Sequence, residues 1–141
     1  MTDVEQDAIA VAQIRAALPE VVAIYRFGST VDGSSGPQSD VDLAVLTTAP
    51  LDPLARFDLQ ERLATALHRS ADLVDLRAAS TVMAMQVVGS GVLLYTTDTA
   101  ARSAFEDLVY GMYARLNEER RGILERVVAE GSVYGDDVYG R

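Results

Sequence analysis

Two aspartates one residue apart, Asp40 and Asp42, open an apolar run in the stretch SDVDLAVL. In a β-strand, residues i and i+2 project from the same face and lie about 6 to 7 Å apart, so both carboxylates would face one side. Val41, Leu43 and Val45 would face the other side and pack against helices. Two like charges this close repel each other unless a divalent cation lies between them. The spacing therefore predicts a metal site built from oxygen ligands.

A Gly-Ser pair, separated from these acids by ten residues, indicates what else the site binds. Gly28 and Ser29 follow the run 21–27, whose β-branched and aromatic residues are typical of a strand. Glycine lets the backbone approach a ligand closely, and turn amides and a serine hydroxyl can donate hydrogen bonds to phosphate oxygens. Magnesium bound beside such a turn would stabilise the attacking and leaving oxygens of a transferring phosphoryl group. The pattern predicts magnesium-dependent nucleotide chemistry.

A third carboxylate is expected from a neighbouring strand, either to complete the metal shell or to accept the proton of the attacking hydroxyl. The segment ADLVDL offers Asp72 and Asp75. They are three residues apart and face opposite sides of a strand, so at most one can join the site. We favour Asp72, because it opens its strand as Asp40 opens its own. Asp75 is the alternative.

The elements that must position these residues follow from hydrophobic periodicity and breaker residues. Asp52 is a predicted N-cap with proline at the first helical position, and Ser80 is a second predicted cap. Gly89 and Gly91 are expected to end the helix that Ser80 begins. The pattern predicts helices over 5–18, 53–69 and 80–88, strands over 21–27, 41–46, 72–76 and 92–96, a loop over 30–39, and a helical stripe from 105 to 127.

Composition excludes several kinds of site. The chain has no cysteine, which excludes disulfides and thiolate chemistry, and its single histidine, His68, excludes a clustered-histidine metal site. All 12 basic residues are arginine, so a P-loop and a Schiff-base lysine are both excluded. Any metal must therefore bind to oxygen.

Charge and length limit the partners and the number of domains. A formal net charge of −9 disfavours sequence-independent nucleic-acid binding, which depends on neutralising phosphates. No apolar run is long enough to span a membrane, and the N-terminal segment is acidic where a signal peptide would be basic. We expect a cytoplasmic protein with one domain over residues 1–141, in which the glycine-rich and acidic tail 131–141 frays.

Gly28 and Ser29, ten residues, and then Asp40 and Asp42 reproduce the signature GS-X10-DXD. With the later stretches DLVDL and GVLLYT, the chain resembles the minimal nucleotidyltransferases of the DNA polymerase β superfamily over roughly residues 5 to 115. The resemblance implies an α/β fold with a small mixed sheet flanked by helices. It also implies that the aspartates hold magnesium and that the Gly-Ser turn binds the triphosphate of ATP.

Members of this family act as antitoxins in HEPN/MNT toxin–antitoxin modules. The resemblance implies that the chain transfers AMP from ATP to a tyrosine of a partner HEPN ribonuclease toxin and so silences it. Two alternatives stay open: an antitoxin that only binds and covers the toxin, and a nucleotidyltransferase that acts on a small molecule. Arg26 departs from the pattern, since an apolar residue is expected there, and the tail after about residue 130 matches no family pattern.

Overall fold

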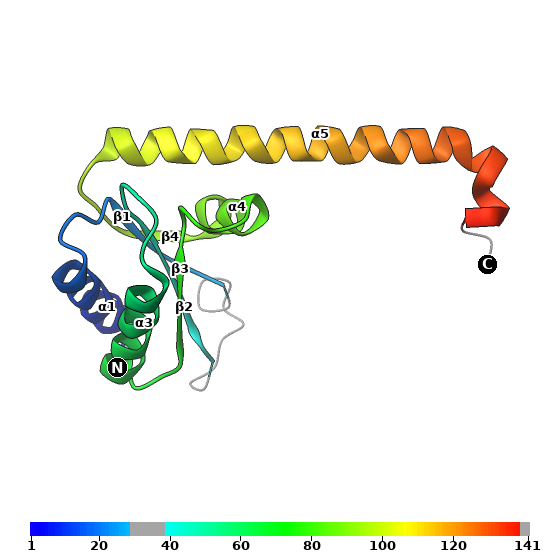
Figure 1. Cartoon of the computed structure of the whole chain (residues 1–141). Helices are drawn as coiled ribbons and strands as arrows, with labels where there is room; N and C mark the ends of the chain where they lie inside the picture. The colour runs from blue at the N-terminus through cyan, green and yellow to red at the C-terminus, as the bar shows by residue number, and fades with distance from the viewer. Residues whose placement is uncertain (29–38, 139–141) are drawn as a thin grey trace.

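The computed structural model describes residues 1–28 and 39–138, in which helices pack on both faces of a four-stranded sheet (Figure 1). The arrangement confirms the α/β fold that the sequence predicts. In chain order the elements are α1 (Asp3–Ala17), β1 (Ala23–Phe27), β2 (Val41–Leu46), α3 (Pro53–Leu67), β3 (Ala71–Asp75), α4 (Thr81–Ser90), β4 (Val92–Thr96) and α5 (Thr99–Val138).

Three helices begin at capping side chains that accept a hydrogen bond from a backbone N–H of the first turn. Thr2 caps α1, and the predicted caps Asp52 and Ser80 begin α3 and α4. Such caps stabilise a helix by about 1 kcal/mol each. At its other end α3 stops at His68, which adopts a left-handed conformation with φ 55°. The exposed histidine is thus a helix cap.

The sheet is mixed, with strand order β3-β2-β1-β4 (Figure 1). β1 pairs antiparallel with both β2 and β4, whereas β2 and β3 run parallel. The parallel pair needs a crossover connection, and α3 supplies it. As a result β2 and β3 both begin at the same edge of the sheet, next to the end of β1.

The hydrophobic core lies on both faces of the sheet. One cluster joins α1 and α3 to the alternate β2 residues Val41, Leu43 and Val45, as the sequence predicts. The other joins α4 and α5 to Ala44 and Leu46. β2 is therefore covered on both sides along most of its length, and only its first residues reach the open edge.

The long helix α5 is fixed to the sheet near its start and then leaves the body of the molecule (Figure 1). Phe105 and Val109 are buried in the second cluster. The Tyr25 hydroxyl donates a 2.8 Å hydrogen bond to the Glu106 carboxylate, which also pairs with Arg102 at 3.0 Å. Burial and this acceptor raise the pKa of Tyr25 well above its ordinary value. At 1.5 Å per residue, the 40 residues of α5 have a length of about 60 Å measured along the helix axis, which bends near its C-terminal end (Figure 1).

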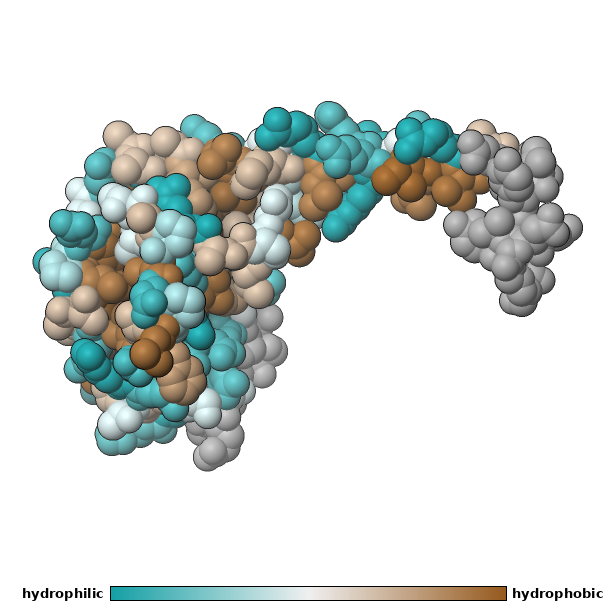
Figure 2. All heavy atoms as spheres, viewed as in Figure 1, coloured by the Kyte–Doolittle hydropathy of each residue, from teal (hydrophilic) through white to brown (hydrophobic). Residues whose placement is uncertain are grey.

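The projecting part of α5 carries apolar side chains that the rest of the described chain does not cover. Figure 2 shows a hydrophobic cluster along this part of the helix. Ile123, Leu124 and Val128 are 50%, 63% and 77% exposed. No helix within the described ranges is both long enough and apolar enough to cross a membrane.

The observed elements differ from the predicted ones at their ends, and one of these differences involves a glycine. Gly89 lies inside the last turn of α4, and the helix ends at Gly91 instead. Gly111 and Gly122 do not interrupt α5, because each costs only about 1 kcal/mol in a helix interior. α5 extends beyond the predicted stripe 105–127 in both directions, from Thr99 to Val138.

Candidate active site

The ends of three strands bring the predicted acids together at one edge of the sheet. Phe27, the last residue of β1, pairs with Asp42 of β2, and Asp42 pairs in register with Asp72 of β3. Paired residues on adjacent strands lie about 5 Å apart and project from the same face. Asp40 directly precedes β2, and its negative charge acts on the Asp42 carboxyl. The three acids therefore form one group.

Gly28 continues the chain beyond β1 directly beside Asp42. It has a positive φ of 78°, and a Cβ added at this position would lie 3.1 Å from Asp42 Cγ and within contact distance of Oδ2. Only glycine adopts this conformation at no steric cost, and only glycine leaves space for the carboxylate. Gly28 of the predicted phosphate-binding turn and the carboxylate of Asp42, a predicted metal ligand, are thus in direct contact.

The charges in this group act on one another. Burial raises the pKa of the Asp42 carboxyl above its ordinary value of 3.8, and the negative charges of Asp72 and Asp40 raise it further. Asp40 and Asp72 are exposed, and Asp42 is partly buried. Within residues 1–28 and 39–138, none of the three forms an ion pair with a basic side chain.

An oxygen-binding divalent cation fits this group, since it would neutralise like charges that no arginine of the described chain pairs with. In the described part of the chain, no group of three or more His, Cys, Asp or Glu side chains is arranged so that together they could hold a metal ion. Magnesium rarely takes a cage made of protein side chains alone. It usually binds one or two carboxylates and completes its shell with water and substrate phosphates.

The two β3 acids lie in different surroundings. Asp75 is 5% exposed and pairs with Val45, on the side of the sheet that α1 and α3 cover. Its carboxylate accepts hydrogen bonds from the backbone N–H groups of Leu51, at 2.8 Å, and Arg77, at 3.0 Å. The Asp75 carboxylate therefore joins the end of β3 to the segment between β2 and α3, and it lies on the opposite face of the sheet from Asp42 and Asp72. Ser29, the remaining predicted site residue, lies outside the described residues.

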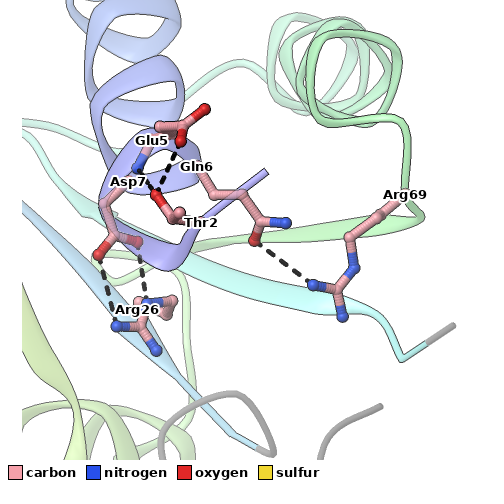
Figure 3. Close-up of polar contacts among 6 residues, drawn as sticks. All are labelled: Thr2, Glu5, Gln6, Asp7, Arg26 and Arg69. Atoms are coloured by element: carbon pink, nitrogen blue, oxygen red, sulfur yellow. Dashed lines mark hydrogen bonds and ion pairs between the residues drawn. The ribbon is translucent and has the colours of Figure 1, made fainter. Parts of the chain in front are cut away.

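Two arginines beside the site are held by the first turns of α1 (Figure 3). Arg26, which departs from the expected apolar pattern, faces α1 and pairs with Asp7 at 3.0 Å. Arg69 donates to Gln6 Oε1 and to the carbonyl oxygen of Ser39. Sequence reasoning missed the contact between Arg69 and Ser39, because these residues are 30 positions apart and no local pattern joins them.

Comparison with known proteins shows the family to which the chain belongs. The family model described as "Polymerase beta, Nucleotidyltransferase" matches residues 10–100. The chain is 41% identical over 116 residues to the protein adenylyltransferase MntA of Shewanella oneidensis, covering 82% of this chain and 83% of that protein.

Solved structures of toxin–antitoxin complexes share the fold. A chain from the crystal structure of a toxin–antitoxin with AMP-PNP is 38% identical, with a TM-score of 0.78 over 86% of this chain and 98% of that one. A chain from the complex of a tri-AMPylated Shewanella oneidensis HEPN toxin with its MNT antitoxin is 35% identical, with a TM-score of 0.76 over 90% and 99%. Sequence, fold and the edge that gathers the acids agree, and the chain belongs to the polymerase β nucleotidyltransferase family.

Proposed function

We propose that this protein is the antitoxin of a HEPN/MNT toxin–antitoxin pair and that it transfers AMP from ATP to a tyrosine of its HEPN toxin, which inactivates the toxin. The observation that carries the proposal is the in-register pairing of Asp42 with Asp72 beside Gly28. The named activity of the 41% identical relative supports the same reaction. The proposed setting is the cytoplasm, where ATP and magnesium are both present.

In this proposal Asp40 and Asp42 hold magnesium, and Gly28 and Ser29 bind the triphosphate. Magnesium, when bound, neutralises phosphate charge and stabilises the leaving pyrophosphate. Asp72 lies next to Asp42 but is exposed, so it is accessible to a hydroxyl arriving from outside. It can complete the metal shell, or it can act as the base.

The proposed reaction forms one bond, breaks one bond and transfers one proton. The tyrosine oxygen of the toxin attacks the α-phosphorus of ATP, and the bond from that phosphorus to the β-phosphate oxygen breaks. Asp72 accepts the phenolic proton, and pyrophosphate leaves with the electron pair of the broken bond. The product is a toxin tyrosine that carries one AMP through a phosphodiester bond.

The test compares two double variants that remove the same charge. Asp40→Asn with Asp42→Asn removes the proposed magnesium ligands, whereas Asp58→Asn with Glu61→Gln removes two exposed acids from α3. Each protein is incubated with purified toxin, radiolabelled ATP and magnesium, and the label on the toxin is measured. Metal stabilisation is worth several kcal/mol, so we expect the first variant to slow transfer by about a thousandfold. The second should act as wild type.

Intact mass of the toxin separates this function from the two alternatives. Transfer adds one or more adenylyl groups to the toxin. Full labelling by the first variant would remove the site assignment. Neutralisation of the toxin with no change in its mass would support the antitoxin that only covers its target. Labelling of a small hydroxyl compound in place of the toxin would support a small-molecule enzyme.

A further inference from the structure

The side chain of Arg69 holds the backbone at the residue before Asp40. Its Nε and Nη2 atoms both donate to the carbonyl oxygen of Ser39, at 3.0 and 2.5 Å. Its Nη1 atom donates to Gln6 Oε1 at 3.4 Å (Figure 3). One guanidinium thus connects α1, the end of α3 and the start of β2.

The peptide on the other side of Asp40 is also held by the same short segment. The backbone N–H of Val41 donates to the carbonyl oxygen of Ser70 at 2.9 Å. Arg69 and Ser70 therefore fix the backbone both before and after Asp40. No hydrogen bond holds the exposed side chain of Asp40 within the described ranges, so its position depends on this backbone.

The end of α3 directs Arg69 toward this contact. His68 has a φ of 55°, which is uncommon for a residue with a Cβ. Its N–H and that of Arg69 both donate to the carbonyl oxygen of Ala64, so the helix closes tightly before the chain turns into β3. The segment that carries Arg69 is short and well anchored, as a clamp on Asp40 requires.

We propose that Arg69 is a positioning residue for Asp40. By holding the Ser39 carbonyl, it keeps the Asp40 carboxylate where it can share a cation with Asp42. The inference rests on the proposed function of these aspartates as magnesium ligands. Loss of the clamp lets the start of β2 move, which weakens metal binding more than it weakens the fold. Changes to groups that orient metal ligands commonly cost about 10 to 100-fold in affinity or activity.

The chain offers a matched control at the opposite end of the same strand. Arg77 Nε donates at 2.8 Å to the carbonyl oxygen of Thr47, which follows β2 just as Ser39 precedes it. Arg77 also lies over the ring of Phe105, so its removal loses more than one contact. Arg77→Gln therefore removes a comparable clamp from β2, yet it leaves Asp40 untouched.

The experiment measures metal binding and transfer separately on the full-length protein. Manganese is titrated in the presence of AMP-PNP and its binding followed by electron paramagnetic resonance, and toxin adenylylation is measured against magnesium concentration. We expect Arg69→Gln to raise the half-saturating concentration of both metals by about tenfold, with the rate recovering at high magnesium. Gln6→Ala should shift it in the same direction by less, and Arg77→Gln should match wild type.

The outcomes are distinguishable. If Arg69→Gln and Arg77→Gln give the same half-saturating concentrations, Arg69 is only a structural residue and the inference is overturned. If Arg69→Gln does not fold, Arg69→Lys, which keeps one donor, and Gln6→Ala decide the question by the same titration. If wild type binds no manganese with AMP-PNP, the proposed function itself fails, whatever the variants do.

Discussion

Replacing Gly28 by alanine tests how closely the turn and Asp42 share space. The new Cβ would lie 3.1 Å from Asp42 Cγ and closer still to Oδ2. Nonbonded carbon atoms prefer separations of about 3.5 to 4.0 Å, so the carboxylate must move by on the order of 0.5 to 1 Å. The Asp42 side chain can rotate, and we expect it to leave its place beside the turn.

The Gly28→Ala substitution has two costs of different size, one in the stability of the fold and one in the rate of transfer. A residue with a Cβ in the left-handed conformation loses about 1 to 2 kcal/mol of stability. A displacement of about 1 Å at a reacting centre can cost about 100-fold in rate, which corresponds to about 2.7 kcal/mol of transition-state stabilisation. Gly28→Ala should therefore remain folded and transfer AMP about 100 times more slowly than wild type.

The assay pairs single-turnover adenylylation of the toxin with unfolding in urea. Gly111→Ala is the matched control, because the residue is inside α5 and a Cβ added there would meet nothing within 4 Å beyond the adjoining backbone of its own helix. Alanine there should stabilise the helix by about 0.5 to 1 kcal/mol and leave the transfer rate unchanged. A Gly28→Ala protein that transfers AMP at the wild-type rate would refute the argument that Gly28 makes room for a catalytic carboxylate.

Four further substitutions test the site and its surroundings. Because the pKa of Asp42 is raised, its ionisation destabilises the metal-free fold as pH rises, so Asp42→Asn should raise the melting temperature at pH 7 and lose that gain below pH 3.8. Tyr25→Phe leaves the Glu106 carboxylate without one donor and should cost about 1 to 3 kcal/mol in urea unfolding. Asp75→Asn should lower the free energy of unfolding by a similar amount and leave the rate of AMP transfer per folded molecule unchanged. Asp72→Asn should slow AMP transfer and leave the free energy of unfolding unchanged.

Local patterns were sufficient to predict most elements of the fold. Strand periodicity predicted β2 and β4 with their observed bounds, and the polar residues Asp52 and Ser80 predicted the starts of two helices. These signals are reliable because an alternating strand must bury one face and a helix start must satisfy its free N–H groups. Glycine was a weaker signal for a helix end, because its small loss of helix stability at Gly89 is outweighed by the packing of α4 against its neighbours.

The relative placement of the acids was predictable where it follows one strand and less so where it crosses strands. The spacing of Asp40 and Asp42 needs only the pleat of β2. The choice of Asp72 over Asp75 depends on which face of β3 each occupies, and the parallel register with β2 supplies that information. The clamp by Arg69 depends on a contact between distant segments, which a single sequence does not encode in any local pattern.

The sheet also explains how the chain tolerates a group of acids that form no ion pair within residues 1–28 and 39–138. Repulsion among Asp40, Asp42 and Asp72 acts at the start of β2, yet Leu43 and Val45, the next residues on the opposite face, are fully buried. Burying such side chains stabilises a fold by about 1.5 to 3 kcal/mol each, which exceeds the repulsion between partly hydrated charges. The register of β2 is therefore fixed by its interior residues. Burial and the repulsion among the acids therefore raise the pKa of Asp42 without opening the strand.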